Sequence, residues 1–176
     1  AHAETRIAMV NGAPVIYQGK LRDHAQNWRG ISDFLHKRSG ESTLGDFHYE
    51  PWDTKLARSV KPYFLIQLST YAEMLEQMQG KRPENLGFVL GDGSETAYRT
   101  GDVWHYYRRL KQAFESFHST WSQDSRPDPA LEKNFGRWSE EASRYLRSID
   151  DLSLVAGITR SQVVRYGKLV SRRLKG

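Results

Sequence analysis

Short runs of strand-forming residues, separated by turn residues, dominate the first third of the chain. The pattern predicts three strands, at 13–21, 28–36 and 47–56. Between the second and third runs, the segment 38–46 has the Gly and Ser composition of a connecting loop. Pro51 interrupts the third run and cannot donate a hydrogen bond to a neighbouring strand. We therefore expect Pro51 to lie in an edge strand or at a bulge.

The spacing of apolar positions changes to three and four residues in the next segment. The residues that follow this helical period are Leu65, Leu68, Ala72, Leu75 and Met78. Pro62 near the start and Gly80 at the end suit the two ends of an amphipathic helix over 61–79. The apolar run 86–90 then predicts a short buried strand, with 96–100 as its candidate partner.

The rest of the chain has mainly helical periodicity. A long aromatic-rich helix is predicted over 102–121, with Asp102 as its N-cap. Its aromatic residues follow helical spacing, which favours core packing over the alternative of stacking on nucleobases. A linker at 122–129 precedes a helix around 138–146 and a final helical pair that starts near residue 150. Strands followed by helices predict an α/β or α+β fold.

Composition narrows the class of protein. The chain has 176 residues, enough for one domain with an appendage, and a net charge of +5. It contains no cysteine, which excludes disulfides, thiolate metal ligands, iron–sulfur clusters and cysteine nucleophiles. No apolar run approaches the roughly 20 residues of a membrane-spanning helix, and the chain starts without an apolar signal segment. We therefore expect a cytoplasmic protein without a membrane partner.

Positive charge is concentrated at the end of the chain. Residues 144–176 contain eight Lys and Arg against two Asp, a net charge of +6 that leaves −1 for residues 1–143. Such a basic segment is typical of a surface that binds a polyanion, most often nucleic acid. A solvated basic helix without a ligand is the alternative, and charge alone does not separate the two.

Asp33, Asp53 and Lys55 form the most informative group of polar residues. Asp33 lies within an apolar strand pattern, where an unpaired carboxylate is costly. Asp53 and Lys55 are two residues apart in the third predicted strand, so their side chains point to the same face. Two carboxylates beside a cation are typical of a Mg²⁺ or Mn²⁺ site next to a group that stabilises phosphate charge. From spacing alone, an ordinary cross-strand ion pair is the alternative.

The first predicted helix adds two polar residues that could reach a phosphate. Gln67 and Tyr71 stand at i and i+4, on one helical face. The histidines, in contrast, show no paired spacing, so a zinc site is not expected. The chain also lacks a phosphate-binding Gly-rich loop, a Gly-x-Ser-x-Gly elbow and a dinucleotide fingerprint.

Three short motifs follow one another along these predicted elements. They are Gly30-Ile-Ser-Asp33, Asp53-Thr54-Lys55 and Gln67-Leu-Ser-Thr-Tyr71. In this order they resemble the Gly-x-x-Asp, Asp-x-Lys and Gln-x-x-x-Tyr motifs of the RecB-like branch of the PD-(D/E)XK nuclease superfamily. The resemblance implies a restriction-endonuclease-like α/β core over 1–122, with a mixed central sheet flanked by helices. A helical connector over 123–149 and a basic tail over 150–176 would follow.

The resemblance also implies a role for each motif residue. The ligands of Mg²⁺ or Mn²⁺ would be Asp33, Asp53 and the carbonyl oxygen of Thr54. Lys55 would be the catalytic lysine, and the helical motif of Gln67 and Tyr71 would support the site and contact DNA. The implied function is a metal-dependent DNA nuclease that hydrolyses phosphodiester bonds in DNA repair or processing.

The chain departs from the family pattern in three places. The family places a further acidic residue or His on a helix before the first strand; this helix is expected to be missing, with His2 and Glu4 as the only candidates. Relatives carry clustered cysteines after the core, where this chain has Lys133, Gly136 and Ala142, so no iron–sulfur cluster is expected. The proline in the third strand could bend the approach to the second carboxylate. The first two departures favour an alternative function, a catalytically silent DNA-binding or scaffolding module that keeps the nuclease fold.

The tail carries a motif of its own. Residues 154–159 followed by 161–164 predict a helix, a tight Gly turn and a second helix, which resembles half of a helix–hairpin–helix module. In such modules, backbone N–H groups at the hairpin bind a DNA phosphate without reading sequence. The residues expected to contact DNA are Gly157, Thr159, Arg160, Arg165 and Lys168. A helical cap on the core is the alternative.

The first residue is Ala rather than Met, so we expect the chain to be a fragment of a longer protein. A helicase region could occupy the remainder of that protein.

Overall fold

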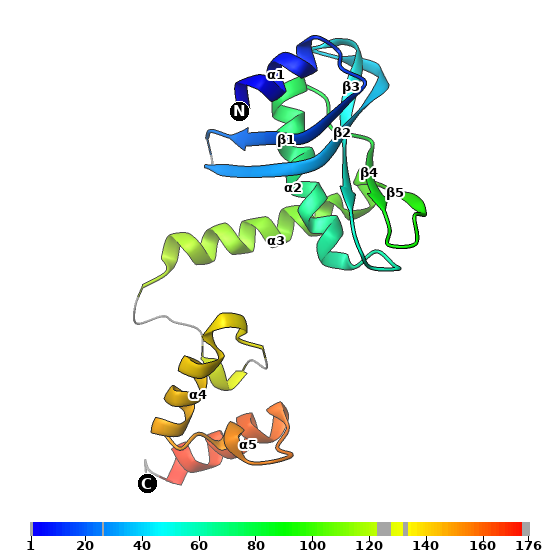
Figure 1. Ribbon diagram of the computed structural model, residues 1–176. Coiled ribbons are helices and arrows are strands. Elements are labelled where there is room, and N and C mark those ends of the chain that lie inside the picture. Colours follow the sequence, from blue (N-terminus) through cyan, green and yellow to red (C-terminus); the bar gives the residue numbers. More distant parts are fainter. Residues whose placement is uncertain (1, 26, 123–127, 132–133, 174–176) are drawn as a thin grey trace. The chain divides into compact units, whose positions relative to one another are not determined.

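The computed structural model describes residues 2–25, 27–122, 128–131 and 134–173 (Figure 1). The chain divides into two compact units, Ala1–Phe117 and His118–Gly176. The first unit holds a five-stranded mixed sheet and three α-helices, and the described part of the second is helical. The expected α/β class, with a mixed sheet and flanking helices, is confirmed.

The sheet has the strand order β1-β2-β3-β4-β5. Strands β1 (Val15–Asp23), β2 (Trp28–Ser42) and β3 (Gly45–Thr54) are joined as an antiparallel meander. Strand β4 (Asn85–Val89) pairs parallel with β3 and antiparallel with β5 (Glu95–Arg99), which confirms the expected pairing of 86–90 with 96–100. A parallel neighbour needs a crossover connection, and helix α2 (Pro62–Gln79) provides it.

The prediction of a connecting loop at 38–46 is wrong. Strand β2 continues to Ser42, which pairs with Gly45 at the start of β3, so only two residues connect the strands. Gly40 and Gly45 have φ angles of +128° and +122°, which residues with a side chain rarely adopt. The glycines therefore allow an irregular end of a hairpin, where their composition alone indicated a loop.

The expectation that Pro51 lies at an edge or a bulge is also wrong, because β3 is a central strand. The backbone N–H of Lys55 donates to Val89 of β4, and that of Tyr49 donates to the side chain of Gln79. The odd-numbered N–H groups of β3 therefore point away from β2. Pairing with β4 begins only at Trp52, so the N–H that Pro51 lacks costs no bond in the ladder.

The expected absence of a helix before the first strand is wrong as well. Helix α1 (His2–Val10) consists largely of good helix formers, including three Ala or Met residues and one Glu. Its buried residues Thr5 and Met9 lie one turn apart and face the sheet. The Thr5 hydroxyl accepts a hydrogen bond from the backbone N–H of Lys20 at 2.9 Å, which attaches α1 to β1.

Helix α2 has the boundaries that the sequence predicts. Pro62 lies in its first turn, and Gly80 ends it with φ +66° and an N–H that donates to the carbonyl of Glu76. Helix α3 (Thr100–Thr120) begins two residues earlier than expected. Asp102 therefore lies within its first turn and is not the N-cap.

A buried carboxylate joins α2 to α3. Glu73 accepts a hydrogen bond from the Tyr107 hydroxyl at 2.5 Å and forms ion pairs with Arg108 at 2.8 Å and Lys111 at 2.5 Å. Burial and the neighbouring Glu73 both raise the pKa of Tyr107, so its hydroxyl stays protonated and donates. These contacts hold the first half of α3 against α2.

The hydrophobic core lies between the sheet and the helices. One cluster joins Met9 of α1 and Met74 and Leu75 of α2 to the buried strand residues Ile16, Leu21, Leu35 and Tyr49. A second cluster packs α2 against β4. The expected core packing of the aromatic helix holds only in part, because Trp104 and Tyr107 are buried whereas Tyr106, Leu110, Phe114 and Phe117 are exposed.

The second unit contains short helical segments. Helix α4 (Ser139–Ser148) covers the helix expected around 138–146, and helix α5 (Arg160–Arg173) is the second member of the expected final pair. The first member is only a 3₁₀ turn, Leu152–Leu154. Among the described residues of the whole chain, no helix has the length and apolar character needed to cross a membrane.

Candidate active site

Asp33 and Asp53 face each other across β2 and β3. The register pairs Phe34 with Trp52, and the next step along the two antiparallel strands sets Asp33 opposite Asp53. Directly opposed like charges destabilise a sheet. The structure thus brings together the two carboxylates that the sequence singled out, in an arrangement that requires compensating groups.

An irregularity in β1 and β2 occurs beside Asp33. Buried and exposed positions alternate along a regular strand, but here the alternation is interrupted on both strands. The interruption lies between Ile16 and Gly19 in β1 and between Ser32 and Leu35 in β2. Gln18 has a φ of +52°, which is unusual for a residue with a side chain. Its side-chain amide donates to Asp33 at 3.3 Å. Because the alternation is interrupted before Asp33, both Asp33 and Leu35 point to the face on which α2 packs.

Thr54 connects the two carboxylates. Its backbone N–H lies 2.9 Å from Oδ2 of Asp33 and 3.1 Å from Oδ1 of Asp53, so these oxygens are at most about 6 Å apart. Its hydroxyl donates a further bond to Asp33 at 2.7 Å. The sequence indicated only the carbonyl of Thr54, and its N–H and hydroxyl emerge as the groups that orient the pair.

Lys55 extends the site from β3 to α2. Its ammonium group forms an ion pair with Asp53, which is 4% exposed, and donates to the side-chain carbonyl of Gln67 at 3.0 Å. The amide of Gln67 in turn donates to the Tyr71 hydroxyl at 3.0 Å. The predicted residues Asp33, Asp53, Lys55, Gln67 and Tyr71 therefore form one continuous polar chain.

Gly30, the first residue of the three motifs, has a steric role in this site. A Cβ at position 30 would lie 2.4 Å from the ring of Tyr71 and 3.4 Å from Met74. Only glycine lets the Tyr71 ring approach β2 this closely. The ring is thereby held where its hydroxyl can accept the bond from Gln67.

The two carboxylates have opposite pKa shifts. Burial raises the pKa of Asp53 to about 6, its hydrogen bond to Asp33 acts in the same direction, and Lys55 opposes both. That hydrogen bond, together with those from Thr54, lowers the pKa of Asp33 to about 2. Between about pH 2 and about pH 6 the pair therefore holds one proton, mainly on Asp53. Such a split between neighbouring carboxylates is common in functional sites.

The donor set fits a hard divalent cation. Two adjacent carboxylates, one of them with a raised pKa, gain stability when a cation replaces the shared proton. Within the described part of the chain, however, no group of three or more Asp, Glu and His side chains with metal-binding geometry is found. Helix α1 is present, but its Glu4 is exposed and its His2 packs against His24, with ring centroids 5.8 Å apart.

The tail residues lie in the second unit. Gly157 has a φ of +76°, and Thr159 and Gln162 cap α5 reciprocally: Gln162 accepts from the Thr159 N–H at 2.8 Å, and the Thr159 hydroxyl accepts from the Gln162 N–H at 3.3 Å. Two hairpin N–H groups are thus already bonded within the chain. Arg160 and Arg165 are exposed, whereas the side chain of Lys168, like the whole of Lys133, lies outside the described residues.

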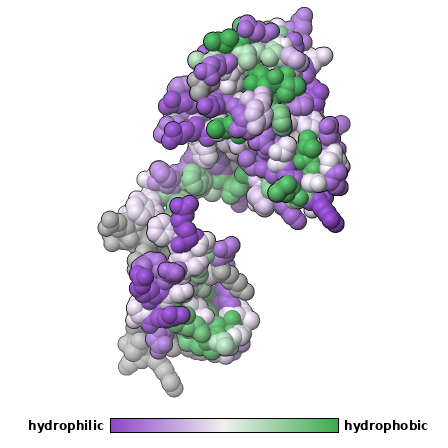
Figure 2. Space-filling model, viewed as in Figure 1, coloured by the Kyte–Doolittle hydropathy of each residue, from purple (hydrophilic) through white to green (hydrophobic). Residues whose placement is uncertain are grey.

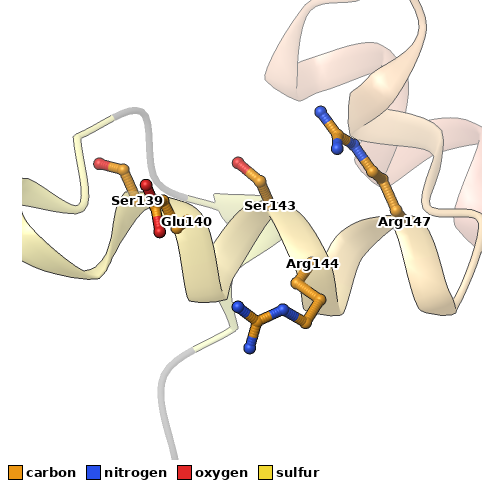
Figure 3. Close-up of a pocket in the computed structure, with 5 residues that line it drawn as sticks. All are labelled: Ser139, Glu140, Ser143, Arg144 and Arg147. Atoms are coloured by element: carbon orange, nitrogen blue, oxygen red, sulfur yellow. The ribbon is translucent and has the colours of Figure 1, made fainter.

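A hollow of about 460 Å³ lies along α4 (Figure 3). It is lined by Ser139, Glu140, Ser143, Arg144 and Arg147, all from this one helix. Arg144 is paired with Glu141 of the same helix at 2.5 Å. The hollow is therefore a feature of an exposed helix surface, and the chemistry described above is concentrated in the first unit.

No protein-family model and no curated protein matches the chain.

Proposed function

We propose that the first unit is a metal-dependent nuclease domain of the RecB-like PD-(D/E)XK type that hydrolyses phosphodiester bonds in DNA. The observation that carries the proposal is the pair of carboxylates, Asp33 and Asp53, joined through the N–H of Thr54 and continued by Lys55. Three motifs that are distant in the sequence meet there. The strand order, with an antiparallel meander followed by a helical crossover to a parallel strand, supports the same proposal.

Each residue has a role that follows from its contacts. Asp33 and Asp53, with the carbonyl of Thr54, would hold Mg²⁺ or Mn²⁺, which supplies Lewis-acid chemistry and offsets negative charge on the phosphate. Lys55 is directed by Asp53 and Gln67, so its ammonium group is positioned to stabilise charge that develops on the phosphate. Tyr71 fixes Gln67 and is a positioning residue.

Cleavage assays with matched variants test this function. Asp53→Ala and Lys55→Ala should each abolish Mg²⁺- or Mn²⁺-dependent cleavage of single- and double-stranded DNA. Lys61→Ala, which removes an exposed lysine just before α2, should leave cleavage unchanged. Equal cleavage by the wild type and all three variants would identify a contaminating nuclease and end the proposal.

A catalytically silent DNA-binding or scaffolding module is the second candidate function. It is favoured by the lack of a third described acidic or His ligand beside the carboxylate pair. Calorimetric titration with Mn²⁺ separates the two candidates. DNA binding without measurable Mn²⁺ binding would support the silent module, whereas Mn²⁺ binding that Asp53→Ala abolishes would support the nuclease.

A further inference from the structure

One face of the sheet is not covered by any of the three helices of the first unit. Met9 of α1 and Met74 of α2 pack in one cluster with Leu21 and Leu35, so both helices lie on the same face. Helix α3 joins this layer through its contacts with Glu73 of α2. Figure 1 shows α2 passing behind β1 and β2, and the outward positions of these strands are largely exposed.

Aromatic rings gather on this uncovered face. Tyr17 of β1 lies 5.6 Å from Phe34 of β2, and Phe34 lies 6.2 Å from His36, measured between ring centroids. His36 stacks on Trp52 of β3 at 4.9 Å with an interplanar angle of 17°, and the guanidinium of Arg38 lies 5.5 Å from the Trp52 ring. We call these five residues the aromatic face.

The aromatic face is buried at one end and exposed at the other. A Cβ at Gly87 would lie 2.1 Å from the Trp52 ring, so this ring rests directly on the backbone of β4 and is only 7% exposed. At the other end, Tyr17 is 70% exposed, although burying a tyrosine ring is favourable. An exposed ring held beside a second aromatic ring is a surface on which a planar group can stack.

The charge around the aromatic face is positive. Its exposed cations are Lys20, Arg22, Arg29, Arg38 and Arg99, at outward positions of β1, β2 and β5. Glu95 is the exposed acid on the outward side of β5, and the nearby Glu50 is buried and paired with Arg38 at 3.4 Å. Figure 2 shows small hydrophobic groups among hydrophilic side chains rather than one continuous apolar surface. Rings interspersed with cations suit a ligand that carries both planar groups and negative charge.

We propose that the aromatic face binds single-stranded DNA, with bases stacked on Tyr17 and Phe34 and phosphates near the surrounding cations. A single strand can present unpaired bases to the rings, whereas a duplex keeps its bases stacked internally. The site lies on the side of β2 and β3 opposite to Asp33 and Asp53, so it is separate from the proposed nuclease site. Binding at the aromatic face does not require a metal or cleavage.

Fluorescence anisotropy with three labelled probes tests the proposal on the full chain, in EDTA and 0.3 M salt. The probes are a thymidine decamer, an abasic decamer with the same phosphates, and a ten-base-pair duplex. Because the salt weakens phosphate contacts, including those of the basic tail, base stacking then dominates. The thymidine decamer should bind at least about fivefold more tightly than the abasic decamer, since stacking contributes about 1–3 kcal/mol per base.

Variants locate the stacking surface. Tyr17→Ala removes an exposed side chain and should weaken thymidine-decamer binding about fivefold or more, whereas Tyr17→Phe keeps the ring and should preserve it. Tyr106→Ala is the matched control, because Tyr106 is a similarly exposed tyrosine on α3.

Four outcomes would overturn the proposal. They are equal binding of the abasic decamer, tighter binding of the duplex, no effect of Tyr17→Ala, and loss of binding in Tyr106→Ala instead. Tighter binding of a uridine RNA decamer would assign the face to RNA, and a dimer that Tyr17→Ala disrupts would assign it to a second copy of the chain. Because every measurement is made in EDTA, a failed cleavage assay leaves the result of this test intact.

Discussion

The ring of Tyr71 lies against the backbone of Gly30, so close that a Cβ there would come within 2.4 Å of it. This contact joins α2 to β2 beside the carboxylate pair. It explains why a glycine precedes Asp33 by three residues in a strand where glycine is otherwise unfavourable.

Gly30→Ala should therefore destabilise the protein. Either the Tyr71 ring or β2 must shift, and overpacking of this kind costs about 1–3 kcal/mol in the free energy of unfolding. Chemical denaturation measures the change. In a Tyr71→Ala background the same substitution should cost much less, and Gly101→Ala, where nothing lies within 4 Å of the added Cβ, should be close to neutral. A full cost in the Tyr71→Ala background would show that the ring is not the obstacle.

Asp53→Asn should stabilise the protein at pH 8. A pKa raised from 3.8 to about 6 means that the folded state binds the proton more tightly than the unfolded state. Stability therefore falls as pH rises from about 4 to about 6, by at most about 3 kcal/mol, and the penalty stays in full above that range. Asp53→Asn also removes the ion pair with Lys55. A net gain of about 1 kcal/mol in the free energy of unfolding should therefore remain at pH 8, and it should shrink toward pH 5. Asp92→Asn, at an exposed turn, should bring no such gain; a destabilised Asp53→Asn would contradict the interpretation.

Mn²⁺ affinity at the carboxylate pair should depend on pH. Because a cation and the proton on Asp53 compete for the same oxygens, affinity should be nearly constant above pH 7 and fall about tenfold per unit below about pH 6. Calorimetry at several pH values gives the profile. Asp53→Asn should remove both the affinity and its pH dependence, and a flat profile in the wild type would place the bound metal elsewhere.

Glu73→Ala should release α3 from α2. The substitution leaves the largely buried Lys111 without its closest carboxylate and removes the acceptor of the Tyr107 hydroxyl, so about 3 kcal/mol of stability should be lost. Thermal unfolding measures the loss. Glu76 lies on α2, like Glu73, and pairs at the surface with Arg82, which lies beyond the end of the helix, so Glu76→Ala should cost less than about 1 kcal/mol.

The tail should contribute DNA affinity through phosphate contacts. Removing Arg160, Arg165 and Lys168 together should flatten the log–log salt dependence of duplex binding by about 2–3 units, since each phosphate contact contributes about 0.9. Binding to all sequences should weaken alike, whereas Mn²⁺ binding should persist because its site lies in the sheet. An unchanged slope would leave the basic tail as a structural cap.

The sequence predicted elements most successfully where one periodicity was uninterrupted. Helix α2 follows from its apolar spacing and from Pro62 and Gly80, and the two central carboxylates follow from their positions in strands. Helix α1 was missed because one of its two buried residues is Thr5, a polar residue, so the sequence lacks an apolar helical period there. Its helix-forming composition was nevertheless a usable signal. The position of Pro51 was predicted wrongly because its missing N–H costs a ladder bond only where β4 is paired, and the residue at which that pairing begins is a tertiary property.

The contacts of the site were less predictable than its members. Nothing local indicates that Gln18 adopts a positive φ or that the N–H of Thr54 bonds to two carboxylates at once. The aromatic face was likewise not recognised, since Tyr17, Phe34 and Trp52 belong to three different strands. Their proximity depends on the register of the sheet.

The two connections that flank β3 have a consequence for the order of folding. Strands β2 and β3 close through two residues, Thr43 and Leu44, whereas β3 meets β4 only after the whole of α2 has been placed. Loop-closure entropy favours the short connection first. The hairpin thus brings Asp33 and Asp53 together before Gln67 can hold Lys55 in place, so their repulsion opposes an early step of folding, and refolding should accelerate when salt screens it.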